Sequence, residues 1–542
     1  MPQPYSSALS RRATPQSEAA LPNQVPNNAG GFVFEVNNWT ALDRFLLLGT
    51  EGGTYYTSPR THTLAATDRV RAAIEEDPSR AIGMIADTSD RGRAPKNDHA
   101  IAALAIAASN PSPSTRALAL DRLPIVCRTG SHLLMFVKII NEMRGWSSGL
   151  RKAIDRWLHT TPNLALQVGK YQAREGMSFR DVLRLAHPKP KDPATAATFR
   201  WIVEKEGIAS ERIVSMGRKG ERTYPALDPA DLPAILRAMD DAHAGRLSMV
   251  EAVAAGLTRE MVPSAWLRDP AWWRLSLPSL PLTAMIRNLA NMTRIGVITP
   301  LGAEERLIID RLDNRGALQA ARIHPISLLI ALKTYQSGSG DRGSNTWTPS
   351  QSIVAALERA FYASFASIPI SDQSTMIALD ISGSMCAPVS GINSLSCHEA
   401  AAAMAMTVVR SCPHHAIVGF SHQLIPLAIN ASMSLKEVVR ELNRHPFGAT
   451  DCALPAIVAK RENLEVDQIV IFTDNETWMG SVHPFQALKA LRAHLNRPVR
   501  QIVVGMTATQ FSIADPSDAL SLDIAGFDAA LPEIINNFGR VR

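Results

Sequence analysis

The spacing of apolar residues changes near residue 370, and this change constrains the fold of the 542-residue chain more than any other feature. Before it, apolar residues recur every three or four positions in one segment after another, which is typical of amphipathic helices. After it, short β-branched apolar runs alternate with helical patterns, which predicts a parallel, doubly wound sheet. Domains usually hold about 100 to 200 residues, so this chain needs more than one core. We therefore predict an all-α region followed by an α/β domain.

The all-α region is expected to be a HEAT-like stack of helical hairpins, in which each pair buries its apolar face on its neighbours. It shows no strict repeat period, and a polar, glycine-rich loop at residues 337–350 precedes its last helix. We place it at residues 31–368, after an N-terminal arm at 1–30 that we predict to be mobile. Its predicted helices are WTALDRFLLLG, DRVRAAIEE, HAIAALAIAA, SHLLMFVKIINEM, LRKAIDRWL, SFRDVLRLA, LPAILRAMDDA, PLTAMIRNLANM, AARIHPISLLIALKTYQ and SIVAALERAFYASF.

The α/β domain is placed at residues 369–542. Its predicted strands are TMIALDI, HAIVGFS, QIVIFTD and RQIVVGM, and its predicted helices are HEAAAAMAMTVVR, LKEVVRELNR, PFQALKALRAHLN and FDAALPEIINNF. Ligands of such sheets bind at the carboxyl ends of the strands. Asp380 and Asp474 each follow such an end, so the candidate site lies there.

The composition favours a globular protein of a reducing compartment. Hydrophobic residues make up 46% of the chain and charged residues 20%, which excludes a disordered chain. The longest apolar run, Ala100 to Ala108, is about half as long as a bilayer span. The N-terminus has no apolar segment of the secretory kind. Five cysteines without a CxxC spacing favour neither disulfides nor zinc. We therefore expect a cytoplasmic protein with no membrane partner.

Positive charge is concentrated in the all-α region. Residues 371–542 contain 12 Lys and Arg against 16 Asp and Glu, net −4, which leaves 44 against 34, net +10, for residues 1–370. An asymmetry of this kind points to a polyanion as the partner of the basic part.

The clearest basic cluster is GKYQAREGMSFRDVLRLAHPKPK, residues 169–191. Lys170 and Arg174 are four residues apart, as are Arg180 and Arg184, so we predict that each pair shares one helical face. Like charges at that spacing repel each other by a few tenths of a kcal/mol. A phosphate-binding surface would explain this repulsion, and a solvated helix face is the alternative that the residues leave open.

Hydroxyl and carboxylate side chains gather at the predicted strand ends. Asp380, Ser382 and Ser384 alternate directly after the first strand, Asp474 ends a later one, and Thr450 lies between them in the sequence. All are hard oxygen donors, which suits Mg²⁺ or Mn²⁺ and argues against zinc. A divalent ion held by two carboxylates and three hydroxyls would still attract an acidic group from outside.

Two other interpretations of this segment stay open. Asp, Ser and Gly are also the residues that turns select, so DISGSM is compatible with an ordinary turn. A phosphoaspartate phosphatase also begins with an aspartate at a strand end. Those enzymes need a second aspartate two residues later, and here Ser382 occupies that position.

The DxSxS motif, with a later threonine and a later strand-end aspartate, resembles the metal-ion-dependent adhesion site of von Willebrand A domains. The resemblance covers about residues 370–542. It implies that Ser382, Ser384 and Thr450 are direct ligands and that Asp380 and Asp474 often act through water. It also implies that a partner's carboxylate fills the sixth position.

The all-α region resembles the Ro ribonucleoprotein family, whose members join a helical-repeat TROVE domain to a von Willebrand A domain. The segments that carry the resemblance are NNWTALDRFLLLGTEGGTYY (37–56), GRAPKND (92–98), RGWSSGLRKAIDRW (144–157), KYQAREGMSFRDVLRLAHPKP (170–190), LPLTAMIRNLANMTRIG (280–296) and RIHPISLLIALKTYQ (322–336). The family implies a ring closed within one chain, without a symmetry partner. It implies small noncoding Y RNAs on the outer basic surface and single-stranded 3′ ends of misfolded noncoding RNAs in the cavity, with exoribonucleases as partners.

Carried over to this chain, the resemblance places Lys170, Arg174 and His187 on the RNA-binding face. Arg180 and Arg184 extend the same face. The pattern departs from the family at Met177 and Phe179, where the family usually has Trp and His, so one RNA contact is in doubt. We interpret three further family matches as structural: Arg287, Arg322 and His324.

The resulting hypothesis is an RNA-binding ribonucleoprotein component without catalytic activity, acting in RNA quality control or maturation. The alternative is a metal-dependent protein-docking scaffold whose main partner is not RNA. A third hypothesis, a metal-dependent phosphatase or nuclease, predicts phosphoryl turnover that Asp380→Ala abolishes. Chelation and Asp380→Ala would abolish partner binding by the scaffold, whereas changes in the basic cluster would abolish RNA binding.

Overall fold

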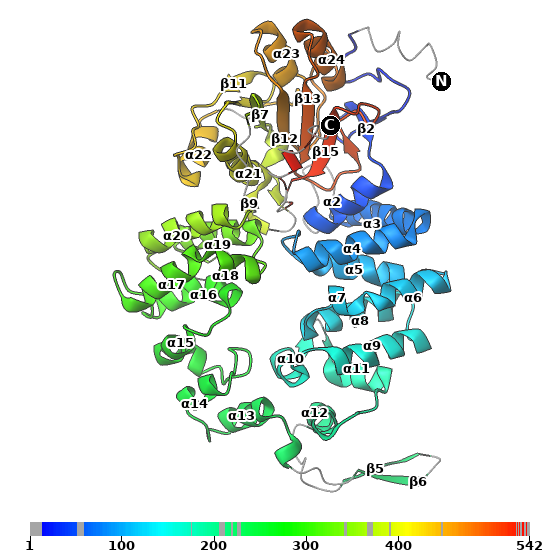
Figure 1. Ribbon diagram of the computed structural model, residues 1–542, viewed down its shortest axis with the longest axis vertical. Helices are drawn as coiled ribbons and strands as arrows, with labels where there is room; N and C mark the ends of the chain where they lie inside the picture. The colour runs from blue at the N-terminus through cyan, green and yellow to red at the C-terminus, as the bar shows by residue number, and fades with distance from the viewer. Residues whose placement is uncertain are drawn as a thin grey trace. The chain divides into compact units, whose positions relative to one another are not determined.

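In the computed structural model (Figure 1), the chain forms two compact units. The helical unit comprises residues 78–90 and 100–308, and the sheet unit comprises residues 1–77, 91–99 and 309–542. This division differs from the expected boundary near residue 368, because the first and last helices of the all-α region pack with the α/β fold. The described residues are 13–50, 59–174, 176–204, 212–217, 220–224, 229–340, 344–365, 372–389, 392–445, 448–526, 528, 531, 534, 535 and 538.

The helical unit consists mainly of short helices with buried apolar faces. Its helices are α4 (Pro78–Arg91), α5 (Asp98–Ala108), α6 (Pro113–Asp121), α7 (Leu123–Val126), α8 (Gly130–Met143), α9 (Ser148–Thr160), α10 (Leu164–Lys170), α11 (Phe179–Ala186), α12 (Pro193–Glu204), η1 (Pro229–Asp231), α13 (Ala234–His243), α14 (Met249–Ala254), η2 (Trp266–Arg268), α15 (Pro270–Ser276), α16 (Leu282–Arg294) and α17 (Ala303–Asp313). Ser147 and Ser178 cap α9 and α11 with their hydroxyls, which explains where these helices begin. Trp157 and Trp272 are fully buried, so the predicted amphipathic pattern is confirmed.

Two short hairpins interrupt these helices, which corrects the prediction of an almost wholly helical region. β3 (Ala173–Arg174) pairs with β4 (Met177–Ser178), and β5 (Arg212–Gly217) pairs with β6 (Gly220–Tyr224). Gly176 lies in the first hairpin with φ of +83°, a conformation that favours glycine. A strand of two residues is too short to show the alternation by which strands are predicted.

The core of the sheet unit is a six-stranded sheet in the order β11-β10-β7-β12-β13-β15. Its strands are β7 (Thr375–Asp380), β10 (His415–Phe420), β11 (Leu424–Pro426), β12 (Gln468–Thr473), β13 (Arg500–Gly505) and β15 (Ser521–Ala525). The sheet is mixed rather than wholly parallel, because β11 returns antiparallel to β10 through a tight turn. The four predicted strands are confirmed as parallel neighbours.

Helices cover both faces of this sheet (Figure 1). The helices that follow the first strand are α21 (Cys397–Ser411), α22 (Leu435–Leu442), α23 (Leu454–Arg461) and α24 (Pro484–Leu495). Side chains of α23 and α24 pack on alternate residues of β7, β10 and β12, while α21 contacts β7 and β12. A short hairpin of β8 (Pro388–Val389) and β9 (Ile392–Ser396) precedes α21. The predicted helix FDAALPEIINNF lies partly outside the described residues.

The described part of the N-terminal segment packs on the sheet unit, whereas we predicted a mobile arm. β1 (Gln24–Pro26) and β2 (Phe32–Glu35) form a small sheet with β14 (Phe511–Ser512). Gln16 is fully buried and donates a hydrogen bond of 2.7 Å to Asp451. The prediction was wrong for residues 13–30 because polar side chains, which suggest solvent exposure in a sequence, make buried hydrogen bonds here. Residues 1–12 lie outside the described residues.

The first and last helices of the all-α region belong to the sheet unit. They are α2 (Asn38–Leu48), α3 (Pro59–Glu76), α18 (Arg315–Ala320), α19 (Pro325–Ser337) and α20 (Gln351–Ala363). Arg44 on α2 is buried and binds both carboxylate oxygens of Asp523 on β15, at 2.6 and 2.8 Å. Lys333 on α19 pairs with Glu399 on α21. The segment predicted as one helix from residue 320 is broken at Arg322, whose φ is +49°.

Candidate functional site

The loop after β7 holds the first aspartate of the predicted metal site in place. Asp380 ends the strand, and one of its carboxylate oxygens accepts the backbone N–H of Ser382 at 2.9 Å. The other oxygen accepts the hydroxyl of Thr473 at 2.6 Å, from the end of the neighbouring strand β12. Thr473 was missed in the sequence, because only the register of β12 against β7 brings it to Asp380.

The structure brings four of the five predicted donors into one buried site and places the loop that carries the fifth, Thr450, beside them. The hydroxyls of Ser382 and Ser384 are 3.1 Å apart, and Ser384 donates a hydrogen bond to Asp474. The loop that carries Thr450 lies next to the loop that carries both serines, because the backbone N–H of Gly383 donates to the carbonyl of Gly448 at 3.4 Å. All five side chains are at most 4% exposed. A single turn, the alternative left open above, would not assemble donors from three segments.

The electrostatics of this cluster favour a cation. Burial and, to a smaller extent, the nearby Asp474 together raise the pKa of Asp380 to about 7. Burial also raises the pKa of Asp474. Two carboxylates that repel each other in a buried place are stabilised by a divalent ion between them. The donor set, two carboxylates and three hydroxyls, fits Mg²⁺ or Mn²⁺. Among the described residues, no group of three His, Cys, Asp or Glu side chains could hold a metal, so the site depends on its hydroxyls.

The basic cluster of the helical unit is arranged differently from the prediction. Lys170 is the last residue of α10, and Arg174 lies on strand β3, so this pair does not share a helical face. The helix ends at Lys170, and the hairpin around Gly176 begins. Lys170 lies over the ring of Tyr171 at 5.2 Å. The pKa of Glu260 is lowered, because Arg259 and Lys170 outweigh the opposing effect of burial, so Lys170 lies close to this carboxyl.

The second predicted pair does lie on one helix. Arg180 and Arg184 are both exposed on α11, and Arg184 pairs with Asp181 at 3.4 Å. His187 follows as the exposed C-terminal cap of α11, in the left-handed conformation with φ of +52°. Three of the predicted basic residues, Arg180, Arg184 and His187, are therefore exposed on α11 and at its C-terminal end.

Two basic residues missed in the sequence lie near Arg174. The hairpin of β3 and β4 contacts α8, which carries His132. Burial, together with the nearby charges of Arg128 and Arg174, lowers the pKa of His132 to about 4, so both arginines lie near His132. Arg128 donates to the hydroxyl of Ser89 at 2.7 Å. No local spacing could have found this group, because Arg174 is more than forty residues away from Arg128 and His132 along the chain.

The residues that we interpreted as structural divide into two kinds. His324 is buried, accepts the backbone N–H of Ile326 at 3.1 Å and lies 2.8 Å from the carbonyl oxygen of Arg93, which confirms a structural role. Arg287 and Arg322 are exposed, so packing does not explain them. Phe179, one of the departures from the family pattern, is buried against Gly130 and belongs to the core.

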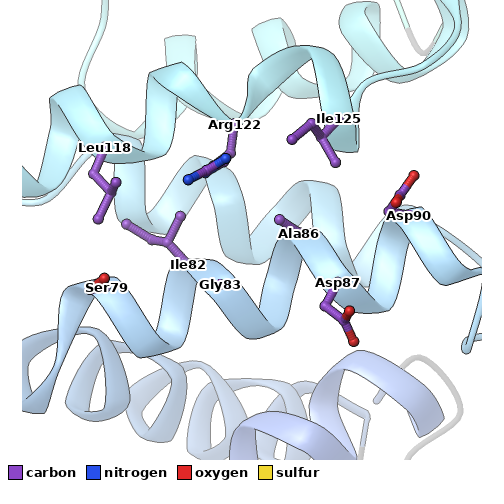
Figure 2. Close-up of a pocket in the computed structure, with 9 residues that line it drawn as sticks. All are labelled: Ser79, Ile82, Gly83, Ala86, Asp87, Asp90, Leu118, Arg122 and Ile125. Atoms are coloured by element: carbon purple, nitrogen blue, oxygen red, sulfur yellow. The ribbon is translucent and has the colours of Figure 1, made fainter.

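A groove of about 270 Å³ lies between α4 and the α6–α7 turn, outside the basic cluster (Figure 2). Arg122 lies between Leu118 and Ile125 on one side, and Asp87 and Asp90 project from α4 on the other. The two carboxylates would repel a phosphate group, so we do not assign this groove to a nucleic-acid surface.

Comparisons with known proteins match both parts of the chain. The family model described as the TROVE domain matches residues 25–231 and 237–334, and the model described as the Ro60 vWA domain matches residues 374–539. Within the described residues, no helix is long and apolar enough to cross a membrane.

Two curated proteins are similar over nearly the full chain. The RNA-binding protein RO60 of Deinococcus radiodurans is 39% identical over 537 residues, which cover 97% of each chain. The RNA-binding protein RO60 of Caenorhabditis elegans is 35% identical over 593 aligned positions, which cover 97% of this chain and 92% of that one. The crystal structure of the Deinococcus radiodurans RO (RSR) protein matches 93% of this chain and 99% of its own, with 36% identity and a TM-score of 0.68.

Proposed function

This chain belongs to the Ro ribonucleoprotein family, and from that premise we propose that it binds small noncoding Y-like RNAs through its basic surface. We define this surface by five exposed or half-buried basic residues, which are Lys170, Arg174, Arg180, Arg184 and His187. We further propose that it takes single-stranded 3′ ends of misfolded or precursor noncoding RNAs into the cavity of a helical ring. In this role it serves RNA quality control or maturation in the cytoplasm, together with a 3′-to-5′ exoribonuclease and without catalysis of its own.

The observation that carries the proposal is the continuity of the basic surface. Its four Lys and Arg residues and His187 follow one another from α10 through the hairpin of β3 and β4 to the end of α11, and few carboxylates accompany them among the described residues. Cations that line one surface can contact successive phosphates of an RNA backbone, and such contacts weaken steeply with salt because condensed counterions are released. Shape and 2′-hydroxyl contacts then allow a structured RNA to be bound with little sequence demand.

Substitution of the basic surface tests this proposal. The affinity of Lys170→Ala/Arg174→Ala and of Arg180→Ala/Arg184→Ala for a structured small RNA is measured by filter binding at several salt concentrations. We expect each double variant to bind at least about tenfold more weakly, with a salt slope smaller by roughly two, because about one unit is lost per phosphate contact. Arg246→Ala is the control, since Arg246 is 64% exposed in the same unit and pairs with Asp241. Unchanged affinity with an intact circular dichroism spectrum would refute the assignment.

The proposed binding of 3′ ends is tested separately. Unpaired bases are held by stacking and electrostatics with little sequence preference. We expect a hairpin RNA with a single-stranded 3′ tail to bind more tightly than the same hairpin with a blunt end. Equal affinities for the two RNAs would contradict this part of the proposal.

A second function is supported by the five buried oxygen donors of the sheet unit. We propose that Asp380, Ser382, Ser384, Thr450 and Asp474 hold Mg²⁺ or Mn²⁺ and that the ion binds a carboxylate of a protein partner. Bound there, the ion would supply an electrophilic anchor for that carboxylate. Titration calorimetry with Mn²⁺ should detect one site in the full chain and none in Asp380→Ala. Identical heats in both proteins would exclude a metal at this position.

A further inference from the structure

Two exposed apolar side chains lie beside the candidate metal site. In the sheet unit, the exposed large apolar residues among those described are Leu64, Trp478 and Met479. Trp478 is 39% exposed and Met479 is 52% exposed, and they follow Asp474 by four and five residues. Single apolar residues on a surface are ordinary, but two neighbours on one loop form a patch.

Backbone hydrogen bonds tie this pair to a candidate metal ligand. The N–H groups of Trp478 and Met479 both donate to the carbonyl oxygen of Thr450, at 3.1 and 3.2 Å. Thr450 also contributes its hydroxyl to the predicted donor set and is buried. The backbone of the apolar pair is therefore attached directly to a residue of the candidate metal site.

The N-terminal segment holds this loop from the other side. Asn27 donates to the carbonyl of Thr477 at 2.7 Å, and the carbonyl of Gly480 accepts the N–H of Gln16 at 2.9 Å. A Cβ on Gly31 would come within 1.9 Å of the Thr477 carbonyl oxygen, so the backbones are in close contact. A loop fixed in this way presents its side chains without an ordering cost on binding.

We propose that Trp478 and Met479 form the apolar half of a docking site, whose partner is a protein segment with an aliphatic or aromatic side chain next to the carboxylate that binds the metal. This inference rests on the proposed metal-dependent docking. A cation flanked by apolar side chains matches a segment that carries both chemistries, and a Trp at the centre of an interface often supplies much of the binding energy.

The charge of the metal site and the side chains of Trp478 and Met479 favour an acidic protein segment as the partner. Asp380 and Asp474 provide only carboxyl groups at the site, and the carboxylate of Glu476 accepts hydrogen bonds from Asn28 and from the N–H of Ala29. These carboxyl groups carry no positive charge, so an acidic segment of a partner finds an attractive charge at this site only when the ion is bound. Trp478 could also stack on an RNA base, but Met479 beside it offers no such stacking surface, so a protein segment fits both residues better.

A displayed library of random peptides with a fixed central aspartate tests the inference. The library is selected on the full chain with Mg²⁺, on Trp478→Ser/Met479→Ser, and on the control Leu64→Ser, whose side chain is 57% exposed in the same unit. We expect aliphatic or aromatic residues to be enriched beside the aspartate on the unchanged chain and on Leu64→Ser. Enriched peptides should bind at least about tenfold more weakly to the double variant in fluorescence anisotropy.

The outcomes separate the two proposals. Aspartate-dependent binding that requires Mg²⁺ but shows no apolar preference would overturn the apolar half and leave metal-dependent docking intact. Absence of any Mg²⁺-dependent peptide binding would overturn both. An apolar preference that persists in Asp380→Ala would show that the patch acts without the metal and would overturn the coupling proposed here. Displacement of an enriched peptide by a single-stranded RNA that binds the unchanged chain and not the double variant would assign the patch to RNA instead.

Discussion

Thr473 shows how a single residue outside the recognised motif can determine the geometry of the site. Its hydroxyl donates to the Asp380 oxygen that the DxSxS loop does not use. The sequence predicted Asp380, Ser382, Ser384, Thr450 and Asp474 as one group, and in the structure Ser382, Ser384 and the two aspartates lie together with the Thr450 loop beside them. It did not predict Thr473, because a strand-end threonine is common and only the pairing register places it opposite Asp380.

Substitution of Thr473 therefore has a specific consequence. We expect Thr473→Val to weaken Mn²⁺ binding by about 10- to 100-fold, because groups that orient metal ligands contribute at this level. The measurement is titration calorimetry with the full chain. Thr375→Val is the matched control, since Thr375 is equally buried at the opposite end of the neighbouring strand β7. Equal Mn²⁺ affinities of the two variants would contradict an orienting role.

A carboxyl at the junction of α2 with the sheet predicts a pH dependence. The pKa of Asp43 is raised to about 6, mainly by burial and partly by the nearby Asp528 carboxyl. Arg93 opposes this shift but does not cancel it. Because the folded state binds the proton more tightly than the unfolded state, ionised Asp43 destabilises the fold above pH 6, by up to roughly 3 kcal/mol before solvent screening.

This penalty is relieved as the pH falls from about 6 toward the unfolded pKa near 4. We therefore expect Asp43→Asn to be more stable than the unchanged chain at pH 7.5, by an amount that shrinks toward pH 5. Urea midpoints measured between pH 5 and 8 check this. A larger stability of the unchanged chain at pH 7.5 would mean that the Arg93 ion pair outweighs burial.

At the scale of elements, α2 is attached to the α/β fold by a buried arginine. Arg44 is 0% exposed, and it donates to the carbonyls of Thr509 and Phe511 at 2.6 and 2.8 Å as well as to Asp523. Its neighbours Leu42, Phe45 and Leu46 form the expected apolar face of α2. The helix could be predicted from this periodicity, but the role of Arg44 could not, since arginines are mostly exposed.

Removal of Arg44 should therefore be severe. We expect Arg44→Ala to destabilise the sheet unit by about 3 to 5 kcal/mol, because it leaves Asp523 buried without its partner. Urea unfolding followed by tryptophan fluorescence measures the change. Arg44→Met/Asp523→Leu is the control, because replacing both partners with apolar residues should recover much of the loss. A double variant as unstable as the single one would indicate that the hydrogen bonds to the two carbonyls dominate.

The basic cluster shows a limit of prediction at the same scale. A spacing of four residues implies one helical face only where a helix is continuous. This condition holds for Arg180 and Arg184 on α11, and it fails for Lys170 and Arg174, because α10 ends between them. The hairpin that follows is made of two-residue strands, which leave no pattern in the sequence. Charge and resemblance pointed to these residues as a candidate surface, but they did not predict its backbone conformation.

At the scale of the whole molecule, the change of pattern near residue 370 correctly separated the two kinds of fold, and it did not locate the compact units. Contacts such as that of Arg44 with Asp523 join residues 479 positions apart, and hydrophobic periodicity carries no information about them. The N-terminal segment was misjudged for the same reason, since Gln16 finds its partner at Asp451.

The proposed RNA surface lies in the helical unit and the candidate metal site in the sheet unit, so we expect their binding functions to be separable. Lys170→Ala/Arg174→Ala should weaken binding of a structured RNA at least about tenfold and leave the Mn²⁺ affinity unchanged. Asp380→Ala should abolish Mn²⁺ binding and leave RNA affinity unchanged, because no phosphate contact is removed. Filter binding and calorimetry on the same preparations measure both quantities. Reciprocal changes, in which Mn²⁺ alters RNA affinity by the same factor as RNA alters Mn²⁺ affinity, would instead establish coupling between the two sites.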